Sequence, residues 1–418
     1  GLRDDRGFHR KLGVSDSAPL HDPGPVDEPP APDAVDAADP APADVGPGGP
    51  EPADSADPAS KLPEESSPPT DLPATGGPAL SFGFNLGKIA GQGEDSDPIL
   101  RDGRELGLVA VFDGMGGAGG TVYETPDGPR TGAYLASRVA RDIVEQRMVA
   151  LLDPDWNLDG PAAAADLQRS VRAALQERLV ALKAPASGLR SRLLRALPTT
   201  MATVALQRRA PDGDRWSCHL FWAGDSRAYV FEPDVGARQL TTDDIRDRGD
   251  AMANLREDSV VSNAMSADTD FVVHHRKVEL TAPFLVVAAT DGCFGYLPSP
   301  MHFEHLVLAA LRDASDTDSW SAAVQAAVGA VTGDDAAMAV LGIGADHDTF
   351  RELFARRSAE LEQRWVTPLD DLDAGLREHE RKLEELRATR RERQARLWAA
   401  YKPGYEWYLG AGTTEGTP

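Results

Sequence analysis

Residues 109–120 are Val-Ala-Val-Phe-Asp-Gly-Met-Gly-Gly-Ala-Gly-Gly, an apolar run that stops at a carboxylate and passes into a glycine-rich turn. A short apolar run bounded by glycine predicts a buried strand, so Asp113 would stand at a rigid strand end. The glycines permit a sharp turn that exposes backbone carbonyls beside the carboxylate. Such a set of hard oxygen donors suits Mg²⁺ or Mn²⁺. Alone, an Asp-Gly pair is more often an ordinary turn.

Three further motifs share this design, in which an acidic residue lies beside glycine or a second acid at the edge of an apolar strand. They are Glu94-Asp95, Asp291-Gly292 and Asp334-Asp335. If their strands belong to one sandwich and share one end, the carboxylates converge in one cleft. They would repel each other strongly there unless a cation neutralised them. The pattern therefore predicts paired Mg²⁺ or Mn²⁺ ions about 3.5–4 Å apart, activating water for attack on a phosphoryl group.

The segments between these motifs predict an α+β domain. Apolar residues at helical spacing indicate helices over residues 131–152, 162–182, 301–311 and 320–331. Strands are expected over residues 81–89, 106–112, 199–206, 217–231, 272–280, 284–289 and 337–343. The strand pattern over 217–231 is interrupted by the turn Gly224-Asp225-Ser226-Arg227, which presents an aspartate. Blocks of strands and helices, rather than strict alternation, favour α+β over a parallel α/β sheet.

Composition divides the chain into a Pro/Ala/Asp-rich acidic linker (1–79), a globular domain (80–346) and a charged C-terminal helix with an aromatic tail (347–418). Residues 15–78 hold 17 of the 32 prolines and 14 acidic residues against a single Lys or Arg, Lys61. Such a segment cannot bury enough apolar surface to offset its ordering entropy, so we expect disorder. The first residue is Gly1 rather than Met, which is compatible with removal of an upstream segment.

The net charge and the cysteines limit the classes of partner and the cellular compartment that we expect for the protein. A formal net charge of −24 argues against nucleic acid or a membrane surface as partner. Cys218 and Cys293 lie in apolar runs and have no metal-binding spacing, so we expect buried thiols in a reducing, cytoplasmic compartment. No apolar run is long enough to span a bilayer, and no signal peptide is visible.

The C-terminal helix carries an apolar seam. Its residues alternate at spacings of three and four: Leu369, Leu372, Leu376, His379, Leu383 and Leu386. The seam continues into Arg390 and Arg393, which favours a helix packed on its own domain over a long coiled coil. Self-association or a partner protein remains the alternative. Five aromatic residues between 398 and 408 should dock on something, within the chain or on another molecule.

Four of these blocks resemble the signature motifs of the metal-dependent serine/threonine protein phosphatases, the PPM or protein phosphatase 2C family. They match in order and spacing: residues 111–117 (Val-Phe-Asp-Gly-Met-Gly-Gly), 224–227 (Gly-Asp-Ser-Arg), 290–292 (Thr-Asp-Gly) and 334–335 (Asp-Asp). The resemblance covers roughly residues 80–345. It implies a β-sandwich of two antiparallel sheets flanked by helix pairs, with a metal site between the sheets.

The resemblance also implies an activity, which is hydrolysis of phosphoserine and phosphothreonine in protein substrates by a metal-bound hydroxide. By similarity, Asp113 would bridge two Mn²⁺ or Mg²⁺ ions, the Gly114 carbonyl would bind one, and Asp113, Asp291 and Asp334 would carry catalysis. The remaining proposed metal ligands would be Glu94, Asp95 and, for a third and weaker ion, Asp225.

Two positions depart from the family pattern. An arginine that grips the substrate phosphate usually stands five residues before Asp95, where this chain has Ala90. Lys88 is nearby but lacks the bidentate fork of arginine. Met115, as is common in bacterial-type members, stands where eukaryotic members often have a histidine, which removes one candidate general acid.

Two other functions compete with the phosphatase. Loss of the arginine favours a weak or inactive pseudophosphatase that binds phosphoproteins, whereas retention of every metal carboxylate argues against it, because buried like charges are costly. A purely structural scaffold would need only the linker and the C-terminal helix, and would leave the carboxylate motifs unexplained.

Overall fold

The computed structural model describes residues 78–409, except residues 90, 104–105, 152–157, 183–194, 211–212, 247–248 and 257–259. Residues 1–77 of the predicted acidic linker lie outside the described residues, and so does Ala90. No helix among the described residues combines the length and the apolar character needed to cross a membrane. Cys218 and Cys293 are buried free thiols, as predicted.

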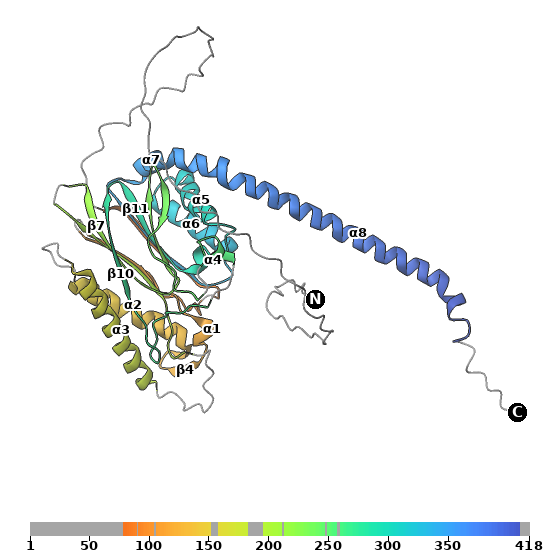
Figure 1. The fold of residues 1–418 in the computed structure, drawn as a ribbon, viewed down its shortest axis with the longest axis horizontal. Coiled ribbons are helices and arrows are strands. Elements are labelled where there is room, and N and C mark those ends of the chain that lie inside the picture. The colour runs from red at the N-terminus through yellow and green to blue at the C-terminus, as the bar shows by residue number, and fades with distance from the viewer. Residues whose placement is uncertain are drawn as a thin grey trace, which may run out of the picture. The chain divides into compact units, whose positions relative to one another are not determined.

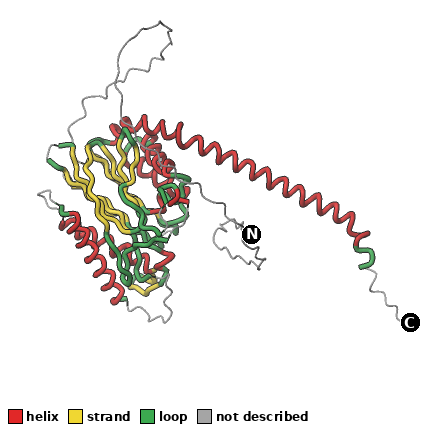
Figure 2. The backbone as a smooth tube through the Cα atoms, viewed as in Figure 1, coloured by secondary structure: helices red, strands yellow, loops and turns green. Residues whose placement is uncertain are grey.

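Two five-stranded antiparallel sheets form the centre of the fold (Figures 1 and 2). The first sheet has the spatial order β1 (Pro78–Leu86), β12 (Ala336–Ile343), β11 (Phe284–Ala289), β8 (Arg227–Glu232), β9 (Gly236–Gln239). The second has the order β10 (His274–Thr281), β7 (Arg215–Ala223), β6 (Met201–Arg208), β3 (Leu106–Val111), β2 (Ile99–Asp102). The predicted β-sandwich is confirmed.

Helices cover the outer face of each sheet. The second sheet packs against α2 (Gly132–Leu151) and α3 (Gly160–Ala181). The first sheet packs against α5 (Pro300–Asp313), α6 (Thr317–Val331) and α7 (His347–Glu360). The smaller elements are α1 (Gly116–Gly119), the hairpin β4 (Val122–Thr125) and β5 (Gly128–Thr131), α4 (Ala253–Arg256) and the 3₁₀ turn η1 (Asp291–Cys293).

The central strands are buried on both faces, which explains their continuous apolar runs. In β3, Leu108 and Ala110 face the helix layer, while Val109 and Val111 face the opposite sheet. Successive side chains of a strand point to opposite faces, so a strand between two apolar layers needs apolar residues at every position. The apolar run in residues 106–112 is therefore what a strand between a helix layer and a second sheet requires.

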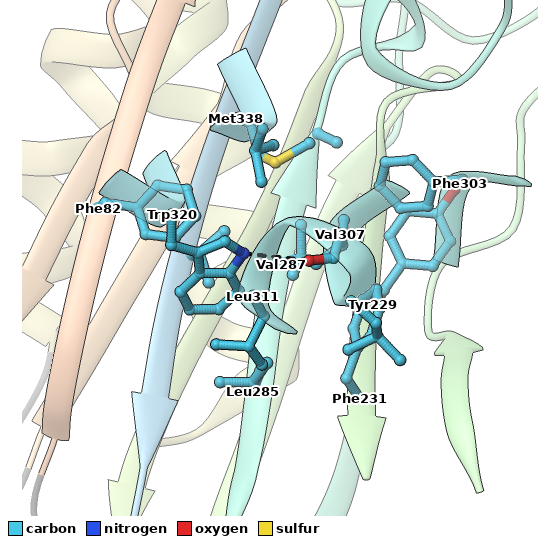
Figure 3. Packing of buried hydrophobic residues seen from close by; sticks show 14 of the residues in the cluster. Phe82, Tyr229, Phe231, Leu285, Val287, Phe303, Val307, Leu311, Trp320 and Met338 are labelled. Atoms are coloured by element: carbon cyan, nitrogen blue, oxygen red, sulfur yellow. Dashed lines mark hydrogen bonds between the residues drawn. The ribbon is translucent and has the colours of Figure 1, made fainter. Parts of the chain in front are cut away.

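Trp320 is the centre of the core between the first sheet and its helices (Figure 3). Its side chain is fully buried and meets the Phe82 ring edge to face at 4.8 Å between centroids. The indole Nε1 donates a hydrogen bond of 3.1 Å to the Val307 carbonyl of α5. Trp320 thereby joins α6, α5 and β1 in one packing unit.

The C-terminal helices divide into a packed and an exposed part. Phe350 and Phe354 of α7, and Leu361 and Val366 of the π-helical segment η2 (Leu361–Val366), are buried. The predicted boundary at 346/347 lies at the first residue of α7. The next helix, α8 (Thr367–Tyr405), contains no buried residue. The expected packing of its seam on the domain is therefore wrong for this helix, because side chains such as Leu376 remain 62% exposed.

Trp320→Ala should lower the free energy of unfolding by about 3–5 kcal/mol, because it removes a large buried ring and leaves a cavity. Val331→Ala, on the same helix but 45% exposed, should change it by less than about 0.5 kcal/mol. Chemical denaturation followed by circular dichroism measures both values. Equal effects of the two substitutions would contradict this assignment of the core.

Candidate functional site

The acidic motifs gather at one end of the sandwich. Glu94 and Asp95 lie where the chain passes from β1 in the first sheet to β2 in the second. Asp113 follows β3, Asp225 lies between β7 and β8, and Asp291 follows β11. Because alternate ends of antiparallel strands share an edge, these four loops meet at the same end of the sandwich.

Two groups hold the Glu94–Asp95 loop from opposite sides. The Asp335 carboxylate accepts hydrogen bonds from the backbone N–H groups of Lys88 (2.7 Å) and Glu94 (2.5 Å). The Arg138 guanidinium, from α2, donates at 3.1 Å to the carbonyls of Gly93, Glu94 and Asp95. This division of donors and acceptors fixes the backbone on which the two acidic side chains stand.

Asp95 is the most enclosed carboxylate of the site. Its side chain is 1% exposed and accepts hydrogen bonds from the Thr290 hydroxyl (2.9 Å) and the Gly114 N–H (3.3 Å). Asp113 and Asp225 each keep part of their surface open to solvent. The Asp113 carbonyl is held by the hydroxyl of Thr199 (2.6 Å) and the N–H of Thr200 (2.9 Å). Backbone and hydroxyl donors therefore orient the acids.

The pKa values show the electrostatic cost of this arrangement. Withdrawal from water, followed by the charges of Asp95, Asp291 and Asp225, holds the pKa of Asp113 well above its usual range. Loss of water contact also raises the pKa of Asp95. The same cause, reinforced by Asp291, raises the pKa of Asp225 to about 8. The site thus disfavours its own negative charge.

Nearby cations relieve that charge only in part, because Arg227 lowers the pKa of Asp225 less than burial and Asp291 raise it. Arg227 lies two residues from Asp225, but its Nε and second terminal nitrogen bind the Asp243 carboxylate at 2.6–3.2 Å. The Arg227 and Asp243 side chains are each only 4% exposed. Arg138 is directed at carbonyl groups rather than at a carboxylate. The carboxylates of the site therefore lie close together, and few positively charged side chains face them.

Glycine is required where the loops pack against one another. A Cβ at Gly116 would overlap a carboxylate oxygen of Glu94, and one at Gly114 would overlap the Glu94 carbonyl. At Gly224 the backbone φ is +102°, a conformation that side chains other than glycine rarely adopt. These glycines let the loops that carry Glu94, Asp113 and Asp225 approach closely.

The predicted site residues fall into two groups. Asp95, Asp113, Asp225 and Asp291 interact electrostatically as one cluster. Glu94 lies beside them, where its carboxylate accepts a 2.6 Å hydrogen bond from Thr131, and loss of water contact raises its pKa. Asp334 is exposed at the rim, and its carboxylate accepts the Asp335 N–H at 2.9 Å. Its charge nevertheless acts on Glu94.

The donor set fits divalent metal ions. It consists of carboxylate oxygens and the Gly114 carbonyl, which are the ligands that Mg²⁺ and Mn²⁺ prefer. One carboxylate oxygen of Asp225, Oδ1, is buried and has no hydrogen-bond partner among the described residues. Within the described chain, no three acidic, histidine or cysteine side chains already surround a common point at metal-binding distance. The ligands would therefore have to adjust as ions enter.

Sequence reasoning assigned no role to Arg138, Thr290 or Arg130, which shape the site. Arg138 orients the Glu94–Asp95 loop and lies in no motif; Thr290 orients the Asp95 carboxylate, and its place in the 290–292 motif gave no sign of that role. Asp335, which the sequence groups with Asp334, binds backbone N–H groups with its carboxylate, and its charge also raises the pKa of Glu94 and Asp95. Arg130 of β5 was also overlooked: it donates to the Gly91 carbonyl (3.1 Å) and lies over the Tyr134 ring.

The raised pKa of Asp225 predicts how stability depends on pH in the metal-free protein. Between the usual aspartate range and about pH 8 the folded state binds more protons than the unfolded state. Stability is therefore full at low pH and is lost as the pH rises through the folded pKa. Melting temperatures in chelator should fall between pH 5 and 8.5.

Asp225→Asn should reduce this fall, since the amide has no proton to lose. Asp234→Asn is the matched control, because that side chain is 91% exposed. Parallel melting curves for the wild-type protein and both variants would contradict the assigned role of Asp225.

No protein-family model and no curated protein matches this sequence. The fold is similar to that of the Mycobacterium tuberculosis serine/threonine phosphatase PstP/Ppp, with 19% identity, 64% of this chain and 99% of that chain covered, and a TM-score of 0.44. The fold is also similar to that of the PPM phosphatase MsPP of Mycobacterium smegmatis in complex with cacodylate, with 14% identity, 64% of this chain and 99% of that chain covered, and a TM-score of 0.43. For the PstP catalytic domain in complex with two manganese ions, the identity is 18%, the coverage 64% of this chain and 98% of that chain, and the TM-score 0.41. These are similarities of fold alone.

Proposed function

We propose that the chain is a Mg²⁺- or Mn²⁺-dependent phosphatase that hydrolyses phosphoserine and phosphothreonine in proteins. The observation that carries this proposal is the convergence of Asp95, Asp113, Asp225 and Asp291 at one open end of the sandwich. Carboxylates that raise one another's pKa in this way favour a bound cation. A purely structural scaffold would gain nothing from them.

We assign Asp113 as the ligand shared between two ions, with Glu94, Asp291, Asp334 and the Gly114 carbonyl completing the set. Asp95 would act beside Asp113, and Asp225, with its unpartnered buried oxygen, would hold a third ion. The bound ions would activate water and offset charge on the phosphoryl oxygens. Asp113, Asp291 and Asp334 are the proposed catalytic residues.

In this proposal the neighbouring residues orient the metal-binding carboxylates and do not themselves transfer protons. Thr290 and the Gly114 N–H hold one carboxylate, Asp95, by both oxygens, so its orientation is set before any ion binds. Thr199 holds the backbone of Asp113. Met115 has no titratable group, so protonation of the leaving oxygen falls to solvent or to a neighbouring carboxyl.

A phosphate monoester also needs a cation on the protein, and Arg130 is the candidate. Its neighbour Thr131 binds Glu94, so β5 places Arg130 at the edge of the acidic site. One terminal nitrogen donates to the Gly91 carbonyl. Among the described residues the other guanidinium donors have no protein acceptor, so they can meet phosphate oxygens. Lys88 is the exposed alternative in the neighbouring loop.

Hydrolysis of an aryl phosphate and a phosphothreonine peptide should require Mn²⁺ or Mg²⁺ and stop in chelator. Asp113→Asn should lower kcat by roughly a thousandfold or more, because loss of this carboxylate weakens the binding of both ions. Asp234→Asn removes one exposed acid far from the site and should leave turnover unchanged. Undiminished turnover in chelator would overturn the mechanism.

Arg130→Ala should raise KM for the phosphopeptide roughly tenfold with a smaller change in kcat, since charge-assisted contacts contribute about 1.5–3 kcal/mol. Arg356→Ala is the matched control, because it removes an arginine that is 78% exposed on α7. If Lys88→Ala raises KM and Arg130→Ala does not, the phosphate contact belongs to Lys88.

A pseudophosphatase is the second candidate, favoured by Ala90 at the position where the resembling family has its phosphate-gripping arginine. Such a protein would bind a phosphopeptide without turning it over. Isothermal titration with the phosphopeptide and Mn²⁺ separates the two functions. Binding without hydrolysis under every metal condition would establish the pseudophosphatase.

A further inference from the structure

The helix α8 presents an apolar stripe that no other described part of the chain covers. Its leucines and aromatic residues are between 43% and 68% exposed: Leu372, Leu376, Leu383, Leu386, Leu397, Trp398, Tyr401 and Tyr405. At 100° per residue these positions fall within one face of the helix. A contiguous exposed stripe of this kind marks an interaction surface.

The charges of α8 are separated along its length. Residues 367–386 carry seven acidic and three basic side chains, and residues 387–405 carry one acidic and six basic. The two halves are therefore electrostatically complementary to each other. A second copy of the same helix, running in the opposite direction, would bring each acidic half against a basic half.

The edge of the stripe shows the same complementarity. Glu380, Glu384, Arg387 and Arg391 follow one another at spacings of four, three and four residues, so they line one edge of the apolar face. None of the four forms an ion pair within the described part of the chain, whereas Arg381, Lys382 and Arg396 pair along the helix. These four side chains are available to a neighbour.

The two arginines of the stripe select the direction of pairing. In a parallel pair, Arg390 would face Arg390 and Arg393 would face Arg393, which buries like charges. In an antiparallel pair centred between residues 386 and 387, Arg390 instead faces Leu383 and Arg393 faces Glu380. The same register places Leu376 against Leu397, and Leu372 against Tyr401.

We propose that α8 forms an antiparallel two-helix coiled coil with α8 of a second copy of this chain. The 39 residues of the helix provide about five heptads, enough for a stable pair. The rings of Trp398, Tyr401 and Tyr405 contact one another, with centroids 5.6–6.4 Å apart. At each end of the pair, these rings would pack against the leucines of the other helix. This pairing is independent of the proposed phosphatase activity.

Cysteine cross-linking of the full chain tests the direction. Leu376→Cys and Leu397→Cys, mixed and mildly oxidised, should give a disulfide-linked dimer. Each variant alone should not, because residues 376 would lie about 30 Å apart across the pair. Cys218 and Cys293 are buried, so the wild-type chain is the blank. Cross-linking of each single variant with itself would overturn the antiparallel arrangement.

Charge reversal tests the edge contacts by sedimentation equilibrium. The variant Glu380→Arg places an arginine opposite Arg393 in this register, so it should raise the dimer dissociation constant by about tenfold or more. Adding Arg393→Glu should restore it. Glu385→Arg changes a charge that pairs with Arg381 on the opposite face, and it should have no effect on the dimer. A chain that stays monomeric at all concentrations, or a double variant Glu380→Arg/Arg393→Glu that does not dimerise, would overturn the proposal.

Discussion

The mutual repulsion of the carboxylates at one end of the sandwich is the constraint on which the rest of the structure depends. Asp95, Asp113 and Asp225 each have a raised pKa because the protein withdraws them from water and places them near like charges. Their loops stay together because backbone N–H and hydroxyl donors hold them, and because the Arg138 guanidinium binds the carbonyls of residues 93–95. The fold therefore holds several carboxylates together without enough positively charged side chains to neutralise them.

Burial on both faces made the strands predictable from the sequence. The run ending at Phe112 and the run from Phe284 to Ala289 are apolar at every position, because each faces a helix layer on one side and a sheet on the other. Amphipathic helices such as α2 were equally visible, since their apolar period is 3.6 residues. The predicted two-sheet sandwich follows from these two patterns.

The rest could not be predicted, because it depends on contacts between distant residues. The hairpin β4–β5 carries mostly polar side chains, and only Tyr123 is buried, so its sequence has no strand period. Arg138 looks like any surface arginine of a helix until the fold brings it beside residues 93–95. The assignment of the individual metal ligands likewise stays a prediction, although the convergence of their carboxylates is observed.

The pairing of β1 with β12 fixes where the flanking segments join the sandwich. Pro78, where the chain enters the sandwich, lies opposite Ile343, where it leaves for α7. Both strands run about 25–30 Å from there to the acidic loops, at roughly 3.3 Å per residue. Both flanking segments are thus joined at the end of the sheet remote from the acidic loops. A tether attached to either segment would therefore act on the end of the sandwich opposite the acidic loops.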